Sequence, residues 1–304
     1  MKQILRITFG LTLTCLAAAL VMGFAFSITD RAKKHNEHMN KQETMLGLLG
    51  YGKARPAPPE LQFYTVYRYI IEDGQNLLLG YLIPVTKGGA KGYELLTLNL
   101  KGEFAGRVEV RLSQDAALEA AERQKALAAV LKRPKNFTYA DSTIIAKLGD
   151  RRAAYLLPGE FTGFKTFVKV MLAVDPSFRI IGLEIMEHEE DPGLGGEIVK
   201  DYFKNQFKGK SFEKVKELAV VKEPLPEEYR KYLEAEKGKQ GHFTEKELEE
   251  LQKKYRDRDI YALTGATISS RCVTDGVKNM VRKFAYRVNI LDKVIASQKV
   301  PVSF

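Results

Sequence analysis

A run of 22 residues without a charged side chain, Ile7 to Ile28, restricts most strongly how this chain can fold. About 20 apolar residues in a helix cross the hydrocarbon core of a bilayer, whereas a cleaved signal peptide has a shorter apolar core of about 7–15. The run also ends in FAFSI, residues 24–28, which is a poor cleavage site. We therefore expect a retained transmembrane helix within residues 1–28.

The charges beside this run do not settle which side of the membrane carries the rest of the chain. Lys2 and Arg6 precede the run, and Arg31, Lys33 and Lys34 follow it. The positive charge that normally marks the cytoplasmic side is thus nearly balanced across the run. A single span cannot form a pore, so any ion transport would belong to partner subunits.

The charge pattern excludes some classes of partner. The net charge is +10, but basic residues alternate with acidic ones, as in residues 245–247 and 253–257. No basic block with interleaved aromatic residues occurs, so we expect no nucleic-acid binding. A mixed-charge surface near an anionic membrane fits the pattern better. The two cysteines, Cys15 and Cys272, are far apart in unlike surroundings, and we expect no disulfide between them.

The body after the anchor is predicted to be α+β, with antiparallel hairpins and packed helices. Residues 29–60 are predicted to form a juxtamembrane stalk and a proline-rich linker, and residues 61–160 a first α+β part. Residues 161–295 are predicted to form a second domain, and residues 296–304 a tail.

Alternation of apolar and polar residues predicts strands at 63–71 and 77–85 and two hairpins, 93–112 (strands 94–100 and 106–112) and 167–186. The hairpins resemble each other, since the turn of each ends in a phenylalanine and a glycine follows. Both an internal duplication and two ordinary hairpins remain open. Between the hairpins, Ser113 is predicted to cap a helix that runs from residue 116 to 131.

The C-terminal third is predicted to be helical. Residues 200–258 are highly charged, and Thr244 and Glu247 have the spacing of a capping box. Near the end of the chain, apolar residues recur at intervals of three and four, which predicts an amphipathic helix docked on the sheet. These residues are Val273, Val277, Met280, Val281, Phe284, Val288 and Leu291.

The segment LTGATISS, residues 263–270, directly precedes this amphipathic helix. Its hydroxyl residues are suited to cap the helix, and backbone N–H groups at a helix start suit a phosphate. Gly265 and Ala266 leave the hydroxyl of Thr267 uncovered. On spacing alone, a simple helix cap with a tight turn is the better explanation of the segment.

The segment HEEDPGLGGE, residues 188–197, directly follows the second hairpin. Its glycines would let a planar ring approach the backbone closely, and Leu194 offers an apolar face. A single histidine beside contiguous acids lacks the spacing of metal ligands, so we expect no metal site. An ordinary surface turn is the alternative.

Taken together, the two segments resemble the FMN-binding-domain family. TGAT, residues 264–267, is similar to its flavinylation motif [S/T]-G-A-[T/S], and residues 188–195 are similar to its H-x-E-T-P-G-L-G loop. DYFKNQFKGK, residues 201–210, resembles the segment that follows this loop. The pattern is most similar to the G subunits of Rnf ion-translocating ferredoxin:NAD oxidoreductases (RnfG), which are related to the C subunits of sodium-translocating NADH:quinone reductases. Two positions depart from the family pattern, Asp191 in place of threonine and Tyr261 in place of aspartate.

The resemblance implies that residues 161–295 form an FMN-binding domain. FMN would be attached through a phosphoester to Thr267 by a separate flavin transferase. The chain would be an electron-transfer subunit that is not catalytic alone. It would lie in the cell inner membrane with one span and a periplasmic body, beside the other membrane subunits of an Rnf-type complex. The other residues implied to contact FMN are Thr264, Gly265, Ala266, Ile268, Ser269, Pro192, Gly193, Leu194 and Gly195.

Three alternatives remain open at this point. The first is a component like the C subunit of a sodium-translocating NADH:quinone reductase. The second is an extracytoplasmic flavoprotein with other partners. The third, from another class, is a membrane-tethered binding domain without a cofactor.

Overall fold

The computed structural model describes residues 2–132, 134–234 and 243–304, and it divides into two compact units, residues 1–47 and 48–304. The first unit consists of helix α1, which spans Lys2–Leu48. Within it, Arg6–Phe24 has a mean hydropathy of 2.0 and is long and apolar enough to cross a membrane. The stalk predicted to begin at residue 29 continues this same helix.

Three threonine hydroxyls in the apolar part of α1 are satisfied inside the helix. Thr8 donates to the carbonyl of Ile4, and Thr12 and Thr14 likewise donate to carbonyls one turn earlier. Lipid offers no hydrogen-bond partner, so a spanning helix must satisfy its polar groups internally. The polar residues of this segment are therefore compatible with a membrane.

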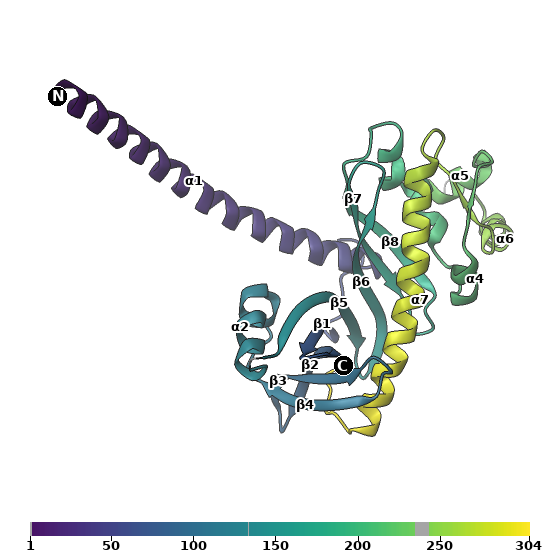
Figure 1. Ribbon diagram of the computed structural model, residues 1–304. Coiled ribbons are helices and arrows are strands. Elements are labelled where there is room, and N and C mark those ends of the chain that lie inside the picture. The colour runs from purple at the N-terminus through teal and green to yellow at the C-terminus, as the bar shows by residue number, and fades with distance from the viewer. Residues whose placement is uncertain (1, 133, 235–242) are drawn as a thin grey trace. The chain divides into compact units, whose positions relative to one another are not determined.

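An antiparallel sheet of eight strands forms the body, in the order β4-β3-β2-β1-β5-β6-β7-β8 (Figure 1). The order describes two four-stranded meanders that join where β1 pairs with β5. The strands are β1 (Leu61–Asp73), β2 (Asn76–Lys87), β3 (Ala90–Asn99), β4 (Phe104–Val110), β5 (Asn136–Leu148), β6 (Arg151–Thr162), β7 (Phe167–Val174) and β8 (Ile180–Glu187). The α+β fold class predicted from the sequence is confirmed.

The predicted strands at 63–71, 77–85, 94–100, 106–112, 167–174 and 180–186 are confirmed as β1 to β4, β7 and β8. The central hairpin β5–β6 was not predicted. Pro158 and Gly159 lie inside β6, and both residue types are uncommon in central strands. The boundary predicted between residues 160 and 161 falls inside β6, so both predicted parts share one sheet.

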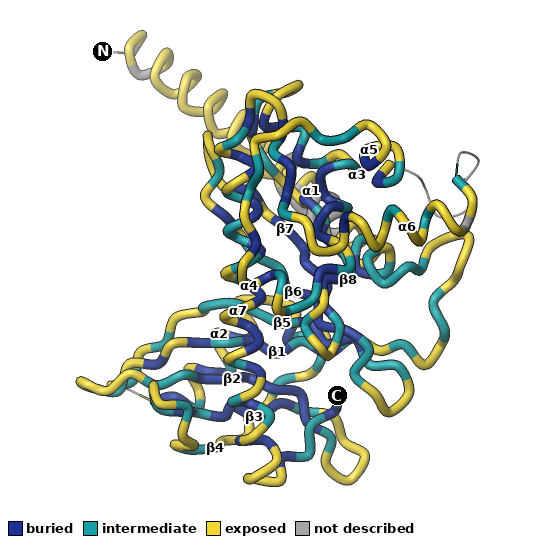
Figure 2. The backbone as a smooth tube through the Cα atoms, turned by 90° about the vertical axis from the view of Figure 1, so that its right-hand side faces the viewer, coloured by how far each residue is buried: buried dark blue, intermediate teal, exposed yellow. Residues whose placement is uncertain are grey.

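Helix α7 (Thr267–Ser297) covers one face of the sheet, from the β7–β8 end to the β3–β4 end (Figure 1). Its predicted apolar stripe is confirmed, since most of its members are buried in the main core. Two glycines allow α7 and β6 to approach each other closely. A Cβ atom on Gly276 would overlap the Phe161 ring, and one on Gly159 would overlap Met280. The buried course of the sheet strands is visible in Figure 2.

Helix α2 (Ala120–Val130) forms a second core with strands of the first meander, on residues that alternate with those facing α7. Arg123 of α2 is buried there, 4.1 Å from the centre of the Tyr67 ring, and donates to the carbonyls of Ala117 and Leu118. The cap predicted at Ser113 serves instead the short 3-10 turn η1 (Ala116–Leu118), where the Ser113 hydroxyl accepts from the N–H of Ala116.

Short elements fill the segment between β8 and α7. The predicted capping box is confirmed, since Thr244 and Glu247 each accept from the other's backbone N–H at the start of α6. Figure 2 shows that α6 is largely exposed. The elements are η2 (Gly195–Val199), α3 (Asp201–Lys204), η3 (Asn205–Phe207), α4 (Phe212–Glu217), β9 (Val220–Val221), α5 (Glu227–Glu234), α6 (Glu245–Tyr255) and β10 (Ile260–Tyr261).

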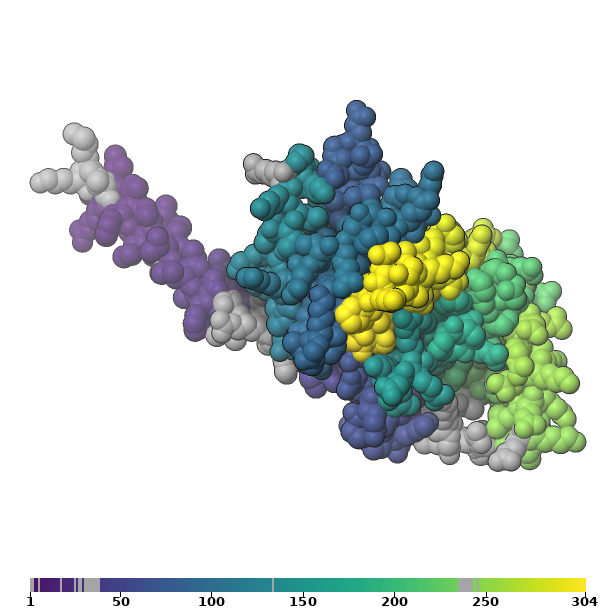
Figure 3. Space-filling view, turned by 90° about the horizontal axis from the view of Figure 1, so that it is seen from below, coloured from purple at the N-terminus to yellow at the C-terminus, as the bar shows by residue number. Residues whose placement is uncertain are grey.

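The C-terminal residues return to the first meander. Val302 forms a bridge with Val85 of β2, and the N–H of Ser303 donates to the carbonyl of Pro84. In the space-filling view, the yellow C-terminal residues lie against the blue of the early strands (Figure 3). The C-terminal residues thus attach the C-terminal end of α7 to the first meander, whereas the N-terminal end of α7 lies at the other half of the sheet.

Candidate functional site

The TGAT segment forms a tight turn that leads directly into α7. The N–H of Ala266 donates to the carbonyl of Leu263 at 3.0 Å, and Gly265, the third residue of this turn, has φ of +73°. A positive φ at the third position is what a type II turn requires, and glycine adopts it without strain. The sequence therefore needs a glycine at this point.

Helix α7 begins at Thr267, and its N-cap residue, Ala266, has no side chain that could cap the helix. The first backbone N–H groups of a helix have no partner inside the helix, and together with the helix dipole they favour an anion. The start of α7 therefore presents donors beside the hydroxyl of Thr267.

The loop after β8 contains PGLG, residues 192–195, and repeats the same turn geometry. The N–H of Leu194 donates to the carbonyl of Asp191 at 3.1 Å, and Gly193 has φ of +75°. Proline at the second position and glycine at the third suit this turn. The carbonyl of Asp191 also accepts from the N–H of Gly196 at 2.8 Å, which closes this PGLG loop onto η2.

These two turns, far apart in the sequence, lie in contact. A Cβ atom on Gly265 would stand 3.0 Å from Cδ2 of Leu194, and one on Gly195 would stand 2.6 Å from Oγ of Ser269. Leu194 and Ile268 are 47% and 60% exposed, although both are large and apolar. The structure thus brings the predicted site residues of both segments together around an open apolar surface beside Thr267.

Glu190 joins the two turns, and its role was missed from the sequence. Its side chain is 5% exposed. Oε1 accepts from the N–H groups of Phe164 at 2.7 Å and Lys165 at 3.3 Å, and Oε2 accepts from the hydroxyl of Ser269. The sequence placed Glu190 only within a polar run. The signal that could have identified it is its match to the single glutamate of the H-x-E-T-P-G-L-G pattern.

The interpretation of the hydroxyl residues after Thr267 as helix caps is wrong. Because the helix starts at Thr267, Ser269 and Ser270 lie within its first turn. The Ser269 hydroxyl donates to Glu190, and the Ser270 hydroxyl accepts from the N–H of Leu263 and donates to the carbonyl of Ala266. Ser270 therefore stabilises the TGAT turn rather than the helix start.

Two residues of the segment 201–210 hydrogen-bond to the part of the chain that precedes the TGAT turn. The buried amide of Gln206 accepts from the N–H of Tyr261 and donates to its carbonyl. Lys210, which is 1% exposed, donates to the carbonyls of Arg256 and Arg258. Burial lowers the pKa of Lys210 to about 8. Both residues hold the strand that leads into the TGAT segment.

Packing explains Tyr261, one of the two departures from the family pattern, and the nearby Asp259. Tyr261 is buried, and its ring lies edge-on against Tyr229 at 6.2 Å. Asp259 accepts from Nζ of Lys214 at 2.8 Å and from the N–H of Ala219, which turns it toward α4. Neither residue supplies a free carboxylate to the TGAT turn.

Cys272 lies one turn after Thr267 but is not set up as a nucleophile. Burial raises the pKa of its thiol to about 11, and the charges of Glu190 and Asp275 act in the same direction. A thiol with such a pKa stays protonated at neutral pH, and the thiolate is the reactive form.

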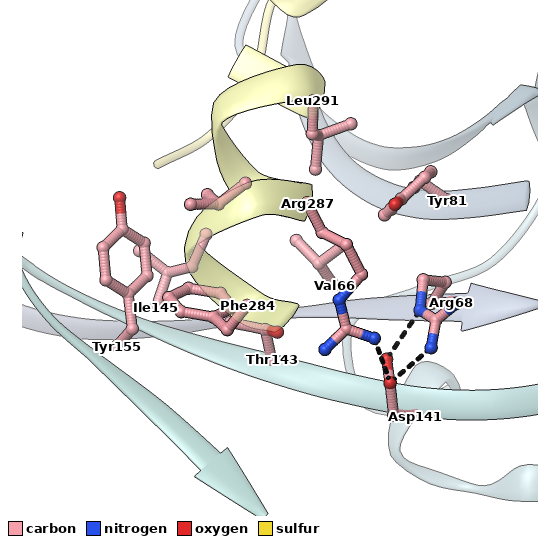
Figure 4. Close-up of a pocket in the computed structure, with 11 residues that line it drawn as sticks. Val66, Arg68, Tyr81, Asp141, Thr143, Ile145, Tyr155, Phe284, Arg287 and Leu291 are labelled. Atoms are coloured by element: carbon pink, nitrogen blue, oxygen red, sulfur yellow. Dashed lines mark hydrogen bonds and ion pairs between the residues drawn. The ribbon is translucent and has the colours of Figure 1, made fainter. Parts of the chain in front are cut away.

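A separate cavity lies between α7 and the middle of the sheet (Figure 4). Arg68 and Arg287 converge on Asp141 there, with distances of 2.6 and 2.7 Å. Burial opposes the charge of Asp141, but the two arginines outweigh it and hold its pKa below the usual value. The cavity measures about 30 Å³, so it has room for water and not for a cofactor of the size of FMN.

Comparison with known proteins identifies the domain around the two turns. Residues 163–282 match the family model described as the FMN-binding domain. The chain carries an FMN-binding domain. The match begins at the β6–β7 turn and includes the PGLG loop, Glu190 and the TGAT segment. The resemblance predicted from the two motifs is therefore confirmed.

A curated relative of the FMN-binding domain is the G subunit of the proton-translocating ferredoxin:NAD(+) oxidoreductase complex of Clostridium ljungdahlii. The two are 33% identical over 138 residues, which make up 45% of this chain and 57% of the relative. The chain thus spans little more than half the length of that protein.

Two solved structures are also similar. One is NqrC of Shewanella oneidensis, at 19% identity and a TM-score of 0.36, covering 58% of this chain and 72% of that one. The other is the C subunit of the Na(+)-translocating NADH-quinone reductase of Parabacteroides distasonis, at 18% identity and a TM-score of 0.35, covering 66% and 77%.

The residues at the two turns fit FMN. The uncapped start of α7 offers backbone donors to a phosphate, and Thr267 offers a hydroxyl for an ester. Gly265 and Gly193 both have positive φ, and the space beside Gly193 is open. Leu194 and Ile268 expose apolar surface next to these turns. Within the described ranges, no cluster of three or more His, Cys, Asp or Glu stands ready to hold a metal ion.

Proposed function

We propose that this chain is a membrane-anchored electron-transfer subunit that carries FMN as a phosphoester on Thr267. The observation that carries the proposal is the position of Thr267. It is the first residue of an uncapped helix and closes the TGAT segment, whose Gly265 meets the exposed Leu194, and the exposed Ile268 follows it.

The chain supplies the acceptor hydroxyl and not the machinery of attachment. A threonine hydroxyl is a weak nucleophile without an adjacent base. The nearest buried carboxylate, Glu190, accepts from Ser269 and not from Thr267. We infer that a separate flavin transferase provides the base. In that reaction the Thr267 oxygen forms the bond to the FMN phosphorus, the pyrophosphate bond of FAD breaks, AMP leaves, and the threonine proton passes to the base.

The side chains around Thr267 would hold the cofactor in place. When bound, FMN supplies the electron-accepting and electron-donating chemistry, while the protein orients it and sets its potential. The start of α7 would bind the phosphate, and Leu194, Pro192 and Ile268 would cover apolar parts of the ring. Gly193 and Gly195 would let the ring approach the loop backbone. Thr264 is exposed at the start of the TGAT segment.

The apolar part of α1 supports a membrane anchor. We propose the cell inner membrane with the body on the extracytoplasmic side, which is what the family resemblance implies. The relative from Clostridium ljungdahlii belongs to an ion-translocating complex. We therefore infer partner membrane subunits of an Rnf-type complex. Protease added to spheroplasts should digest residues 50–304, and full protection of these residues would contradict the orientation.

A differently partnered extracytoplasmic flavoprotein is the second candidate. The first meander favours it, because β1 to β4 lie outside the residues that match the FMN-binding-domain model. Co-purification separates the two candidates. The protein isolated in mild detergent from its native host should bring other membrane redox subunits with it if the first candidate holds, and should emerge without them if the second does.

The proposed cofactor is tested by the absorption spectrum and intact mass of protein purified from its native host. We expect flavin absorption and a mass increase of one FMN ester that survives denaturation. A colourless protein with the unmodified mass would overturn the proposal and favour a cofactor-free binding domain.

A further inference from the structure

The carboxylate of Glu190 is shared by three segments that the fold brings together. It accepts from the backbone of the β6–β7 turn at Phe164 and Lys165 and from the side chain of Ser269 on α7, and it lies itself at the base of the PGLG loop. The β6–β7 turn is closed by a hydrogen bond of 2.6 Å from the N–H of Gly163 to the carbonyl of Thr166. One buried side chain therefore fixes two loops against the start of the helix.

The space around this carboxylate is fully used. A Cβ atom on Gly163 would collide with Oε1 of Glu190, and one on Gly195 would stand 2.6 Å from Oε2. Real Cβ atoms do not approach other atoms that closely, so either substitution would push the carboxylate away from Ser269. Glycine at these two positions therefore leaves the space that the Glu190 carboxylate occupies, in addition to its role in the turns.

We propose that Glu190 is a positioning residue, which holds the first turn of α7 so that Thr267 stands ready for flavin transfer and which keeps a buried negative charge behind the flavin. The inference rests on the function proposed above. It deepens that function by assigning a role to a residue that does not itself touch the acceptor hydroxyl.

Geometry supports the positioning role. Ser269 lies two residues after Thr267 in the same helical turn, so a restraint on the Ser269 side chain also restrains the backbone that carries Thr267. Group transfer is sensitive to displacements of the acceptor, and a shift of about 1 Å can lower a rate by about 100-fold.

The charge of Glu190 also acts on a group near the start of α7. It contributes to the raised pKa of the Cys272 thiol, which lies on the same stretch of helix. The nearest cation on the β6–β7 turn, Lys165, pairs with Asp191 at 2.5 Å instead of with Glu190. A negative charge at this place opposes the addition of electrons to a flavin beside it, because like charges repel.

The first test measures the rate of flavin transfer to the full-length protein in detergent, with purified flavin transferase and FAD, followed by flavin fluorescence on denaturing gels. Glu190→Ala should slow transfer by about 10- to 100-fold. Glu189→Ala, which removes an exposed neighbour of the same charge, should match the wild-type rate. If Glu190→Ala is modified as fast as wild type while its thermal unfolding shows a folded protein, the proposal is overturned.

A conservative variant separates positioning from charge. Gln at position 190 can accept from Phe164 and donate to Ser269, so Glu190→Gln should recover most of the transfer lost in Glu190→Ala. The reduction potential of its bound flavin should be more positive than that of wild type, whereas Glu189→Gln should leave it nearly unchanged. A purely structural role would not move the potential, so an unchanged potential in Glu190→Gln would contradict the charge assigned to this residue.

A double variant tests whether Glu190 acts through Ser269. If it does, Glu190→Ala and Ser269→Ala combined should slow transfer much less than the product of their separate effects. Fully multiplicative effects would contradict the coupling. The wild-type protein distinguishes the two possible failures. If the wild type never takes up flavin, the proposed function is wrong. If the wild type takes up flavin and Glu190→Ala takes it up at the same rate, only this inference is wrong.

Discussion

The two halves of the sheet share a strand layout, but only one half carries the flavin site. β1 to β4 and β5 to β8 are both four-stranded antiparallel meanders, and they meet at the β1–β5 pair. The hairpins that resemble each other in sequence are the last two strands of each meander, β3–β4 and β7–β8. An internal duplication stays a prediction, but the equivalent placement of the hairpins is what it would produce.

The halves differ in the segment that comes after the last strand. After β4 the chain enters η1 and α2, which form an apolar core with the first meander. After β8 it enters the PGLG loop, which meets the start of α7. The comparison teaches that the strands serve as a rigid support, while the chemistry resides in one loop and one helix start that this support holds together.

A core substitution in the first half gives the largest expected effect on stability. Leu127 of α2 is fully buried, so Leu127→Ala should lower the free energy of unfolding by about 2–5 kcal/mol. Flavin attachment to the protein that remains folded should not change, because Leu127 packs in the core of the first meander, which includes no residue of the PGLG loop or the TGAT turn. Thermal unfolding and the flavin content per folded protein measure both. Loss of flavin from stable Leu127→Ala protein would break the division between the halves.

In the half that carries the site, the buried Lys210 should make the stability of the fold depend on pH. Its pKa is lowered from 10.5 to about 8 in the folded protein, so the unfolded chain binds more protons between these values. The wild type should therefore gain about 1–3 kcal/mol of stability as pH rises from 8 to 10.5. In Lys210→Met this gain should be absent. Urea unfolding of both proteins across this range provides the measurement, and parallel pH profiles would contradict the buried charge.

The smallest expected effect on stability comes from the exposed surface beside Thr267. Leu194 is 47% exposed, so Leu194→Glu should leave the unfolding temperature close to that of wild type. With flavin attached, the new charge would face the ring, and an unpaired charge against an apolar face is costly. We expect the covalent bond to persist while the flavin spectrum or potential shifts. An unaltered spectrum and potential would remove the PGLG loop from the site.

Regular patterns explain which parts of the fold could be predicted. β1, β7 and α7 show clear apolar periodicities, and all were predicted within a few residues. β5 and β6 do not. β6 contains Pro158 and Gly159, and it is a strand because β5, β7 and α7 enclose it. Such tertiary support leaves no periodic signal in the sequence.

The site shows the same limit. TGAT and PGLG are contiguous segments, so their turns could be predicted from the local sequence. The family's loop pattern marks Glu190, but its role could not be assigned from the sequence. Its partners are the backbone N–H groups of Phe164 and Lys165 and the hydroxyl of Ser269, which no local pattern connects. The same holds for Ser270, whose bond to Leu263 is visible only once the turn is folded.

The central claim, that Thr267 carries the flavin, is tested most directly by peptide mass mapping. The full-length protein would be coexpressed with a flavin transferase, digested, and the mass of one FMN ester assigned to a residue between Thr264 and Ser270. We predict the modification on Thr267, its loss in folded Thr267→Val, and its retention in Ser269→Ala at a reduced rate. Flavin on Thr264, Ser269 or Ser270, or covalent flavin retained in Thr267→Val, would contradict the account.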